Sequence, residues 1–325
     1  MIKKGSFIVL LLGSVLFAVL SNSCGSSSNE AAADQDSISG DISVSGAFAL
    51  YPMATRWAEE YQKLHPEVRI NISAGGAGKG MADVLAGMVD LAMFSREVTG
   101  EELDKGAWPL AVSRDAVLAT VSSRNPMMDY LRSHGMKRSD FEKMFVKGNL
   151  NNWERMSGKG GPSHINVFTR SDACGAAEMW ALYLGVHQED LIGTGVFGDP
   201  GMASAVKEDK NAVGYNNLNY VYDVSTRKKY DGLEVIPIDL NENGLIDSSE
   251  NFYSTMDELT AAIKSGLYPS PPARDLYFVS KGKPERAVVR DFLRWVLTDG
   301  QKFIHEAGYV ELPEEQLSGE ITKLN

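Results

Sequence analysis

A run of oxygen-bearing side chains between Asp239 and Glu250 has the spacing of a calcium-binding loop. In the 12-residue EF-hand loop, side-chain oxygens occupy positions 1, 3, 5, 9 and 12, a backbone carbonyl occupies position 7, and glycine makes the turn at position 6. The predicted ligands are Asp239, Asn241, Asn243, the carbonyl of Leu245, Asp247 and Glu250. We expect one structural calcium ion in a lone loop and no cofactor for chemistry. The competing interpretation is an acidic Asn/Gly turn without metal.

Cys174 is the residue whose type fits a nucleophile. It stands in a turn before a predicted helix, where the helix dipole and nearby Arg170 would lower the pKa of the thiol, and His164 lies upstream. A Cys–His hydrolase also needs a third orienting residue and an oxyanion motif, and the sequence indicates neither. We therefore expect no enzymatic activity, and the hydrolase is kept only as a third hypothesis.

Three turns built from small residues predict anion binding. Strands predicted to end at Val44, Ile72 and Phe168 each pass almost directly into a helix. Such turns direct free backbone N–H groups and the positive end of a helix dipole toward one place, and ligands bind beyond the carboxyl ends of strands in open α/β sheets. Each turn alone is compatible with mere tight packing, and residues 75–80 lack the spacing of a Walker or dinucleotide loop. Together the three turns predict an anion-binding cleft.

The elements that must position these turns alternate between strands and helices. Predicted strands lie at residues 42–44, 68–72, 89–94, 116–121 and 165–168. Alternation of this kind builds an α/β fold with mainly parallel sheets. After its first 40 residues, the 325-residue chain is still longer than one hydrophobic core usually accommodates, so we expect two lobes.

The N-terminus predicts export. Lys3 and Lys4 precede an apolar run at residues 7–20, which is too short to span a bilayer and has the length of a signal-peptide core. The small residues before Cys24 resemble a lipobox, so we expect a signal peptide at 1–23, a lipid on Cys24 and a tether at 24–40. The alternative is an ordinary secretory peptide with an incidental cysteine. The predicted location is extracytoplasmic in the cell envelope, periplasmic or at the cell surface, with the lipid in a membrane.

Charge excludes two classes of partner. The formal net charge of −11 and the isoelectric point near 5.0 argue against nucleic acid and against polybasic membrane binding, because both need clustered Lys and Arg. The chain has two cysteines, and a lipidated Cys24 would leave Cys174 without a disulfide partner.

The ordered motifs resemble the phosphate-binding proteins of ABC transporters, which have the type II periplasmic binding protein fold. The matching segments are residues 45–52, 78–80, 87–92, 95–96, 115–117, 145–148, 152–153, 169–175, 212–215, 268–269, 274–277 and 292–295. The resemblance implies two α/β lobes, each a mainly parallel sheet flanked by helices, with crossing hinge strands between them. The implied boundaries are lobe 1 at 41–117, lobe 2 at 118–232, and a return to lobe 1 at 233–325 that includes the loop 239–250.

The resemblance also implies a binding site and a partner. Arg170 matches the arginine that binds phosphate, and Ser95 occupies the position that in some members is an aspartate. The other implied ligand-binding residues are Ala49, Leu50 and Tyr51 in the first loop, Ala77 and Gly78 in the glycine loop, and Cys174, Gly175 and Ala176 after the arginine. The implied ligand is phosphate or a related oxyanion, and the implied protein partners are ABC permease subunits, with the binding protein acting as a monomer.

Several side-chain donors of the family are missing from this chain. Cys174 and Ala176 replace a serine and a threonine, and the first loop has alanines in place of hydroxyl residues. Each hydrogen bond to a charged group contributes about 1.5–3 kcal/mol, so the loss needs compensation by Lys79, Arg96 or water. The alternatives are a different oxyanion, an organic phosphate, or a site of backbone amides alone. A protein of another class also fits, namely an envelope or surface interaction protein of the same fold that has lost tight phosphate binding.

Overall fold

The computed structural model describes residues 38–325, and the structural statements below concern this range. The predicted signal peptide, the lipid on Cys24 and most of the tether lie outside the described residues. Residues 38–325 all belong to one compact unit. Within the described range, no helix combines the length and the apolar character that crossing a membrane requires.

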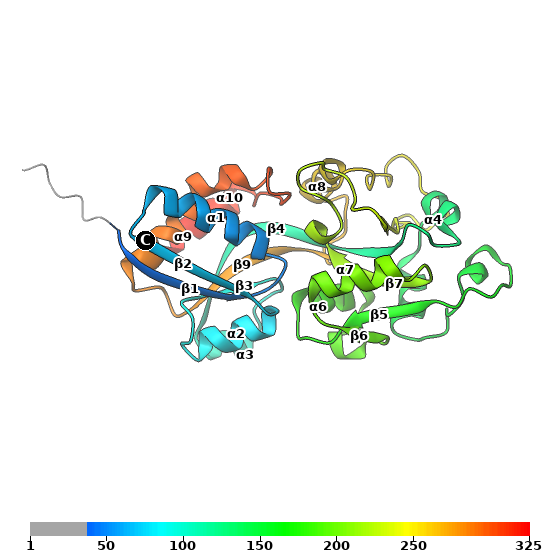
Figure 1. Ribbon diagram of the computed structural model, residues 1–325, viewed down its shortest axis with the longest axis horizontal. Helices are drawn as coiled ribbons and strands as arrows, with labels where there is room; N and C mark the ends of the chain where they lie inside the picture. The colour runs from blue at the N-terminus through cyan, green and yellow to red at the C-terminus, as the bar shows by residue number, and fades with distance from the viewer. Residues whose placement is uncertain (1–37) are drawn as a thin grey trace, which may run out of the picture. The chain divides into compact units, whose positions relative to one another are not determined.

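Lobe 1 is built on three parallel strands covered by helices (Figure 1). The strands are β1 (Gly40–Gly46), β2 (Val68–Ala74) and β3 (Leu91–Phe94), and the helices are α1 (Tyr51–Leu64), α2 (Ala77–Leu85), α3 (Gly100–Asp104), α9 (Ala287–Leu297) and α10 (Glu314–Lys323). Helix α1 begins with Pro52 in its first turn, where a missing N–H costs nothing, and buries Trp57 and Tyr61 one turn apart. The apolar face of α9 packs on the same core through Phe292 and Trp295.

Two long antiparallel strands connect the lobes. They are β4 (Ala107–Ser122) and β9 (Ala273–Lys281), which pair with each other from Ala107 to Ala116. In lobe 1, β9 pairs with β3. The far half of β4 continues into lobe 2, where it pairs with β7 (Ala212–Asn217) and β8 (Leu233–Val235).

Lobe 2 places β5 (Asn166–Arg170) between β7 and β6 (Thr194–Val196), with parallel pairing on both sides. Its helices are α4 (Met128–His134), α5 (Arg138–Phe145), α6 (Gly175–Leu184), α7 (Gly198–Glu208) and α8 (Met256–Ser265). Short 3-10 turns lie at Trp153–Ser157, Gln188–Asp190 and Leu218–Tyr220 here, and at Asp299–Phe303 in lobe 1. An aromatic cluster of Phe141, Phe145, Trp180 and Tyr215 joins α5 and α6 to β7.

The strand order of the whole sheet is β2-β1-β3-β9-β4-β7-β5-β6, with β8 on the edge of β4. Pairing is parallel inside each lobe and antiparallel at the crossing strands. The predicted fold class, an α/β protein of two lobes with crossing strands, is confirmed. The largest difference in a strand concerns residues 116–121, which are only the far half of β4.

The chain returns to lobe 1 later than we predicted. The expected return was at residue 233, but β8 pairs with β4 in lobe 2, and Ile238, Tyr253 and Leu259 belong to the lobe 2 core. The return takes place at β9. An extended apolar segment such as residues 235–238 fits the edge of either lobe equally well. The pairing of Leu233–Val235 with β4 places the segment in lobe 2.

Candidate anion-binding site

The N-termini of α2 and α6, which belong to different lobes, lie against each other. The Gly78 N–H donates a hydrogen bond to the Ala173 carbonyl at 3.0 Å. A Cβ atom on Gly78 would lie 2.8 Å from Ala173 Cβ, and one on Gly175 would lie 2.2 Å from the Ser95 carbonyl oxygen. Only glycine allows this approach, so the lobes contact each other at the place where the predicted turns meet.

Helix α6 presents two uncapped amides at this contact. The first amides of a helix have no acceptor inside the helix. In α6, Ala177 N–H donates to Cys174 Sγ at 3.4 Å, and Glu178 N–H donates to the Cys174 carbonyl at 3.2 Å. This leaves the N–H groups of Gly175 and Ala176 without an acceptor among residues 38–325.

Helix α2 presents two more uncapped amides at the same contact. Gly75 and Gly76 donate their N–H groups to a carbonyl of lobe 1, and Gly78 donates to lobe 2. No acceptor in the described part of the chain serves the amides of Ala77 and Lys79. Because the positive ends of the α2 and α6 dipoles meet here, the four free amides favour an anion at the contact.

The first loop contributes less than the resemblance implied. Leu50 N–H donates to the Ala47 carbonyl at 3.3 Å, and Tyr51 N–H donates to the Phe48 carbonyl at 3.2 Å. These two predicted amides are therefore used inside their own turn. The Ala49 carbonyl accepts from the buried Tyr309 hydroxyl at 2.7 Å, which holds the loop against lobe 1.

Arg170 lies at the end of β5 and is buried, with 5 % of its surface exposed. Its Nε and Nη2 donate to the two carboxylate oxygens of Asp172 at 2.8 and 2.7 Å, and Nη1 donates to Asp199 at 2.7 Å. The planar fork that the resemblance assigned to phosphate therefore binds Asp172. Of the five N–H donors of a guanidinium, two remain for a ligand.

The immediate surroundings of Arg170 carry a formal charge of −1, because two carboxylates face one guanidinium. Burial opposes the charge of Arg170, yet Asp199 and Asp172 raise its pKa above the ordinary value. The ring of Phe48 lies 5.7 Å from the guanidinium carbon and covers one face of it. An oxyanion bound here would gain from the amides of α2 and α6 and would be repelled by the spare carboxylate charge.

The thiol of Cys174 has the wrong properties for a nucleophile. Burial raises its pKa to about 12, so it is neutral at neutral pH. Its predicted partner His164 precedes β5, whereas Cys174 follows Arg170 at the other end of that strand. A strand rises about 3.3 Å per residue, so the length of β5 separates the two side chains. The structure does not bring the Cys–His pair together.

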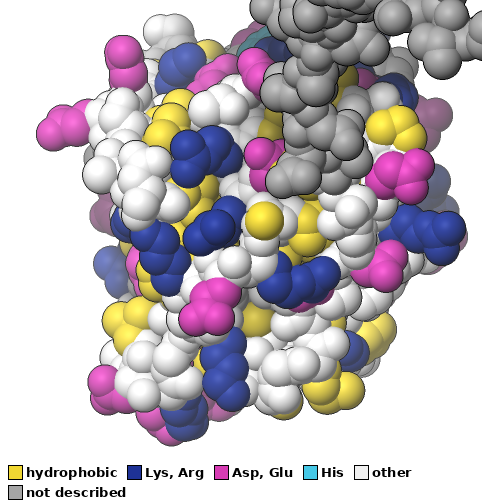
Figure 2. Space-filling view, turned by 90° about the vertical axis from the view of Figure 1, so that its left-hand side faces the viewer, with side chains coloured by type: hydrophobic (Ala, Val, Ile, Leu, Met, Phe, Trp, Pro, Cys, Tyr) yellow, Lys and Arg dark blue, Asp and Glu magenta, His cyan; other side chains and the backbone are white. Residues whose placement is uncertain are grey.

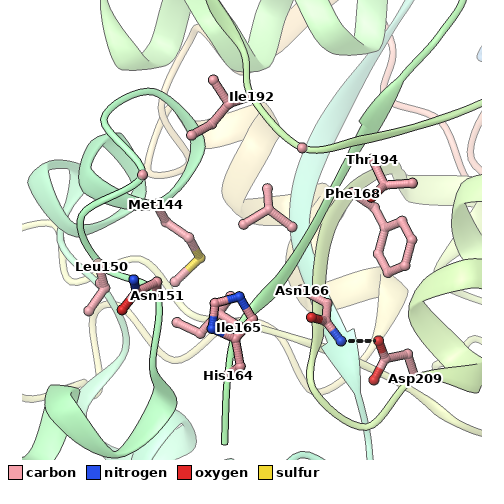
Figure 3. Close-up of a pocket in the computed structure, with 13 residues that line it drawn as sticks. Met144, Leu150, Asn151, His164, Ile165, Asn166, Phe168, Ile192, Thr194 and Asp209 are labelled. Carbon is pink, nitrogen blue, oxygen red and sulfur yellow. Dashed lines mark hydrogen bonds between the residues drawn. The ribbon is translucent and has the colours of Figure 1, made fainter.

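His164 instead lines a cavity of about 480 Å³ at the N-terminal end of β5 (Figure 3). Asn166 and Asp209 close one side of this cavity through a hydrogen bond of 2.6 Å, and Met144 and Ile192 supply apolar walls. The three small-residue turns that predict anion binding lie at the carboxyl ends of the strands, so this cavity is separate from them.

The two cations proposed as compensation are already engaged. Arg96 donates to both carboxylate oxygens of Glu102 at 2.9 and 2.7 Å, and the Lys79 ammonium pairs with Asp83. Arg96 also lines a cavity of about 640 Å³ between the lobes, beside Cys174. The site therefore relies on amides and on Arg170 for its positive potential.

A buried polar chain leads from Arg170 into the crossing strands. Asp199 also accepts from Asn217 Nδ2 at 2.6 Å, and Asn217 accepts from Arg274 of β9. Arg274 lies 3.4 Å from the Asp115 carboxylate on β4, and burial raises the pKa of Asp115 to about 6. Sequence reasoning missed Asp199 and Asn217, since neither stands in a motif. Asp172 was detectable, two residues after Arg170.

Charge on the surface is mixed. On the lobe 1 face in Figure 2, basic and acidic side chains are interspersed and form no basic patch. Ion pairs such as Arg286–Asp90 and Arg56–Glu60 join basic to acidic side chains in the described part of the chain. That nucleic acid is not a partner stays a prediction from the net charge.

Comparisons with known proteins identify the family of this chain. A family model described as a PBP superfamily domain matches residues 29–300. The phosphate-binding protein PstS of Methanocaldococcus jannaschii is 27% identical over 310 residues, covering 80% of this chain and 79% of that protein. The phosphate-binding protein PstS of Staphylococcus aureus is 23% identical over 329 residues, covering 99% of this chain and 92% of that protein.

Solved structures show the same fold. A phosphate ABC transporter substrate-binding protein from Clostridium perfringens, solved with bound phosphate, superposes with a TM-score of 0.69 at 20% identity. The alignment covers 84% of this chain and 100% of the Clostridium perfringens chain. The resemblance that the motifs indicated is confirmed. With its family model matched from residue 29 to residue 300 and its two-lobed α/β architecture, this chain belongs to the PBP superfamily, with the type II periplasmic binding protein fold.

Proposed function

We propose that this protein is an extracytoplasmic binding protein that captures phosphate or a related oxyanion between its lobes and delivers it to an ABC permease. In this proposal a lipid on Cys24 holds it at a membrane, it acts as a monomer, and no covalent chemistry takes place. The relatives named as phosphate-binding proteins support the ligand class, and the fold supports binding by opening and closing of the lobes.

The observation that carries the proposal is the meeting of two helix N-termini from different lobes. The free amides of Ala77, Lys79, Gly175 and Ala176, with the two spare N–H groups of Arg170, offer up to six donors. At about 1.5–3 kcal/mol for each hydrogen bond to a charged group, four of these donors outweigh a repulsion of roughly 3 kcal/mol from one excess carboxylate. Backbone amides can therefore replace the missing hydroxyl side chains.

Calorimetric titration of the purified protein with inorganic phosphate and then sulfate tests the proposal, with Gly175→Ala as the critical variant. Gly175 begins α6, where alanine is a good helix former, and the atoms nearest to its added methyl group belong to Ser95 of the other lobe, so the variant must move the lobes apart at this contact. Gly319→Ala is the matched control, because Gly319 lies in α10 with no atom within 4 Å of the added Cβ.

We expect saturable 1:1 binding in the native protein and in Gly319→Ala, and at least a tenfold loss of affinity in Gly175→Ala at an unchanged melting temperature. Equal affinities in the three proteins would show that the anion binds elsewhere.

A second candidate function is supported by the carboxylates around Arg170. Asp172 fills the guanidinium fork and Asp199 takes a further donor, an arrangement that is complete without any ligand. This favours the envelope or surface interaction protein that keeps the fold without tight phosphate binding. Absence of heat with every oxyanion, from a folded sample, would select this candidate.

A further inference from the structure

The loop Asp239–Glu250 is held at its first and eighth positions by other residues of lobe 2. Asp239 N–H donates to the Met136 carbonyl at 3.0 Å, and Ile246 N–H donates to the Ser133 carbonyl at 2.9 Å. Both acceptors lie at the end of α4 or in the connection from α4 to α5. In a paired EF-hand a second loop would supply such a contact, whereas here the neighbouring connection supplies it. The loop is therefore ordered without a partner loop.

The first residue of the loop has an unpaired carboxylate oxygen inside the protein. Asp239 is 2 % exposed, and its Oδ2 accepts from the Gly244 N–H at 2.8 Å, so the carboxylate faces the interior of the loop. Its Oδ1 is buried and has no hydrogen-bond partner within residues 38–325. A buried carboxylate oxygen without a donor is costly, and a cation removes that cost.

No side-chain cation among residues 38–325 performs this task. The Lys137 ammonium approaches the loop but donates to the carbonyl of Glu242, at the fourth position, which is not a ligand position. Asp239 Oδ1 is therefore available to bind a cation from solution.

The other predicted ligands keep lone pairs for a metal. Asn241 Oδ1 accepts from the Asn243 N–H at 3.0 Å, and Asn243 Oδ1 accepts from the Leu245 N–H at 2.8 Å. An amide oxygen has two lone pairs, so each retains one. Asn241 Nδ2 also donates to Asp247 at 3.0 Å, which brings the third and ninth positions together.

Glu250, the last predicted ligand, is 2 % exposed, although glutamate is almost never fully buried without a partner. Its Oε1 accepts from the N–H groups of Leu240 and Asn241 at 2.7 and 2.9 Å, which folds the end of the loop back on its beginning. The first and twelfth positions thus lie on the same side of the loop, as a shared ion requires.

Carboxylates alone do not make this site. Within residues 38–325, no group of three His, Cys, Asp or Glu side chains is arranged to hold a metal ion. The loop instead combines carboxylates with amide and carbonyl oxygens, a set of six or more hard ligands in flexible geometry. Such a set suits calcium better than magnesium, which demands a tight octahedron, or zinc, which prefers nitrogen and sulfur.

We propose that the loop binds one calcium ion through Asp239 Oδ1, the side-chain oxygens of Asn241, Asn243, Asp247 and Glu250, and the carbonyl of Leu245. On binding, the second oxygen of Glu250 joins the ion while the first keeps its amide contacts. The ion ties the loop to the α4–α5 connection and stabilises lobe 2. The anion site between the lobes takes no part in it.

The test uses the full chain after treatment with EDTA and dialysis, titrated with calcium chloride by calorimetry and melted with and without millimolar calcium. Glu250→Gln is the main variant, since its amide oxygen still accepts from Leu240 and Asn241 but its charge is lost. Asp247→Asn is the second, and its exposed side chain makes misfolding no concern. Glu242→Gln is the matched control, with the same chemical change at a position that is not a ligand.

We expect one calcium per chain and a rise of several degrees in melting temperature in the native protein and in Glu242→Gln, with a much smaller response to magnesium. Calcium affinity should fall at least tenfold in Glu250→Gln and in Asp247→Asn. Absence of heat and of any shift in the native protein would overturn the proposal, and so would a native response in Asp247→Asn and Glu250→Gln. Phosphate titrations of the same samples should be unchanged, which separates this result from that of the anion site.

Discussion

Replacing Asp199 by asparagine should strengthen anion binding. Asp199 is the carboxylate in excess, because Asp172 already holds Arg170 through two hydrogen bonds. The substitution keeps an oxygen that can accept from Arg170 Nη1 and removes one negative charge from a buried position. The formal charge around Arg170 then changes from −1 to zero.

The size of the effect follows from the geometry of the guanidinium. A ligand on the spare N–H groups of Arg170 would lie on the order of 6 Å from Asp199, where unit charges at an effective dielectric constant of about 20 interact by roughly 3 kcal/mol. That energy corresponds to about a hundredfold in affinity. Loss of the acceptor for Asn217 Nδ2 should lower the free energy of unfolding by about 1 kcal/mol.

Calorimetry with phosphate and sulfate measures the gain, and the melting temperature measures the cost. Asp129→Asn is the control, since the carboxylate of Asp129 on α4 is fully exposed and its charge is screened by solvent. Affinity in Asp199→Asn that is equal to or weaker than that of the native protein would refute the charge argument.

Two further predictions concern titratable groups. The pKa of Cys174, raised to about 12 by burial, should protect its thiol from iodoacetamide at pH 8 in the folded protein, with labelling after denaturation. Rapid labelling of Cys174 in the folded protein, located by peptide mass spectrometry, would contradict this. Burial raises the pKa of Asp115 from 3.8 to about 6. The unfolded chain therefore releases this proton at a lower pH than the folded protein does, and the contribution of Asp115 to the free energy of unfolding falls as the pH rises from 4 to 6. The free energy of unfolding of the native protein relative to Asp115→Asn should therefore drop by roughly 2–3 kcal/mol over that interval in urea titrations, and a constant difference would disprove it.

Much of the fold could be predicted because its elements leave local signals. The small-residue turns after β1, β2 and β5 and the order of the motifs were sufficient for two α/β lobes with crossing strands. The return to lobe 1 could not be located, since residues 235–238 have only the pattern of an extended apolar segment, and the pairing of Leu233–Val235 with β4 is a long-range choice. Local patterns carry no information about which strand edge is free.

The site was predictable to a lesser degree. Gly78 and Gly175 lie at a contact between the two lobes, as the turns implied, but a partner of Arg170, Asp199, comes from a distant position in the chain. Asp199 lies in α7 and reaches Arg170 only after β5, β6 and α7 have packed. The state of Cys174 likewise depends on tertiary burial, which reverses the lowering of its pKa that the helix dipole and Arg170 alone would produce.

The central claim is that backbone amides of two helix N-termini hold the anion. Amide NMR of the isotopically labelled protein during a phosphate titration tests it most directly, with Gly175, Ala176, Ala77 and Lys79 as the reporting residues. The largest shifts should fall on these four amides and saturate together. Shifts confined to other regions, such as the cavity beside His164, or no shifts at saturating phosphate, would contradict the account.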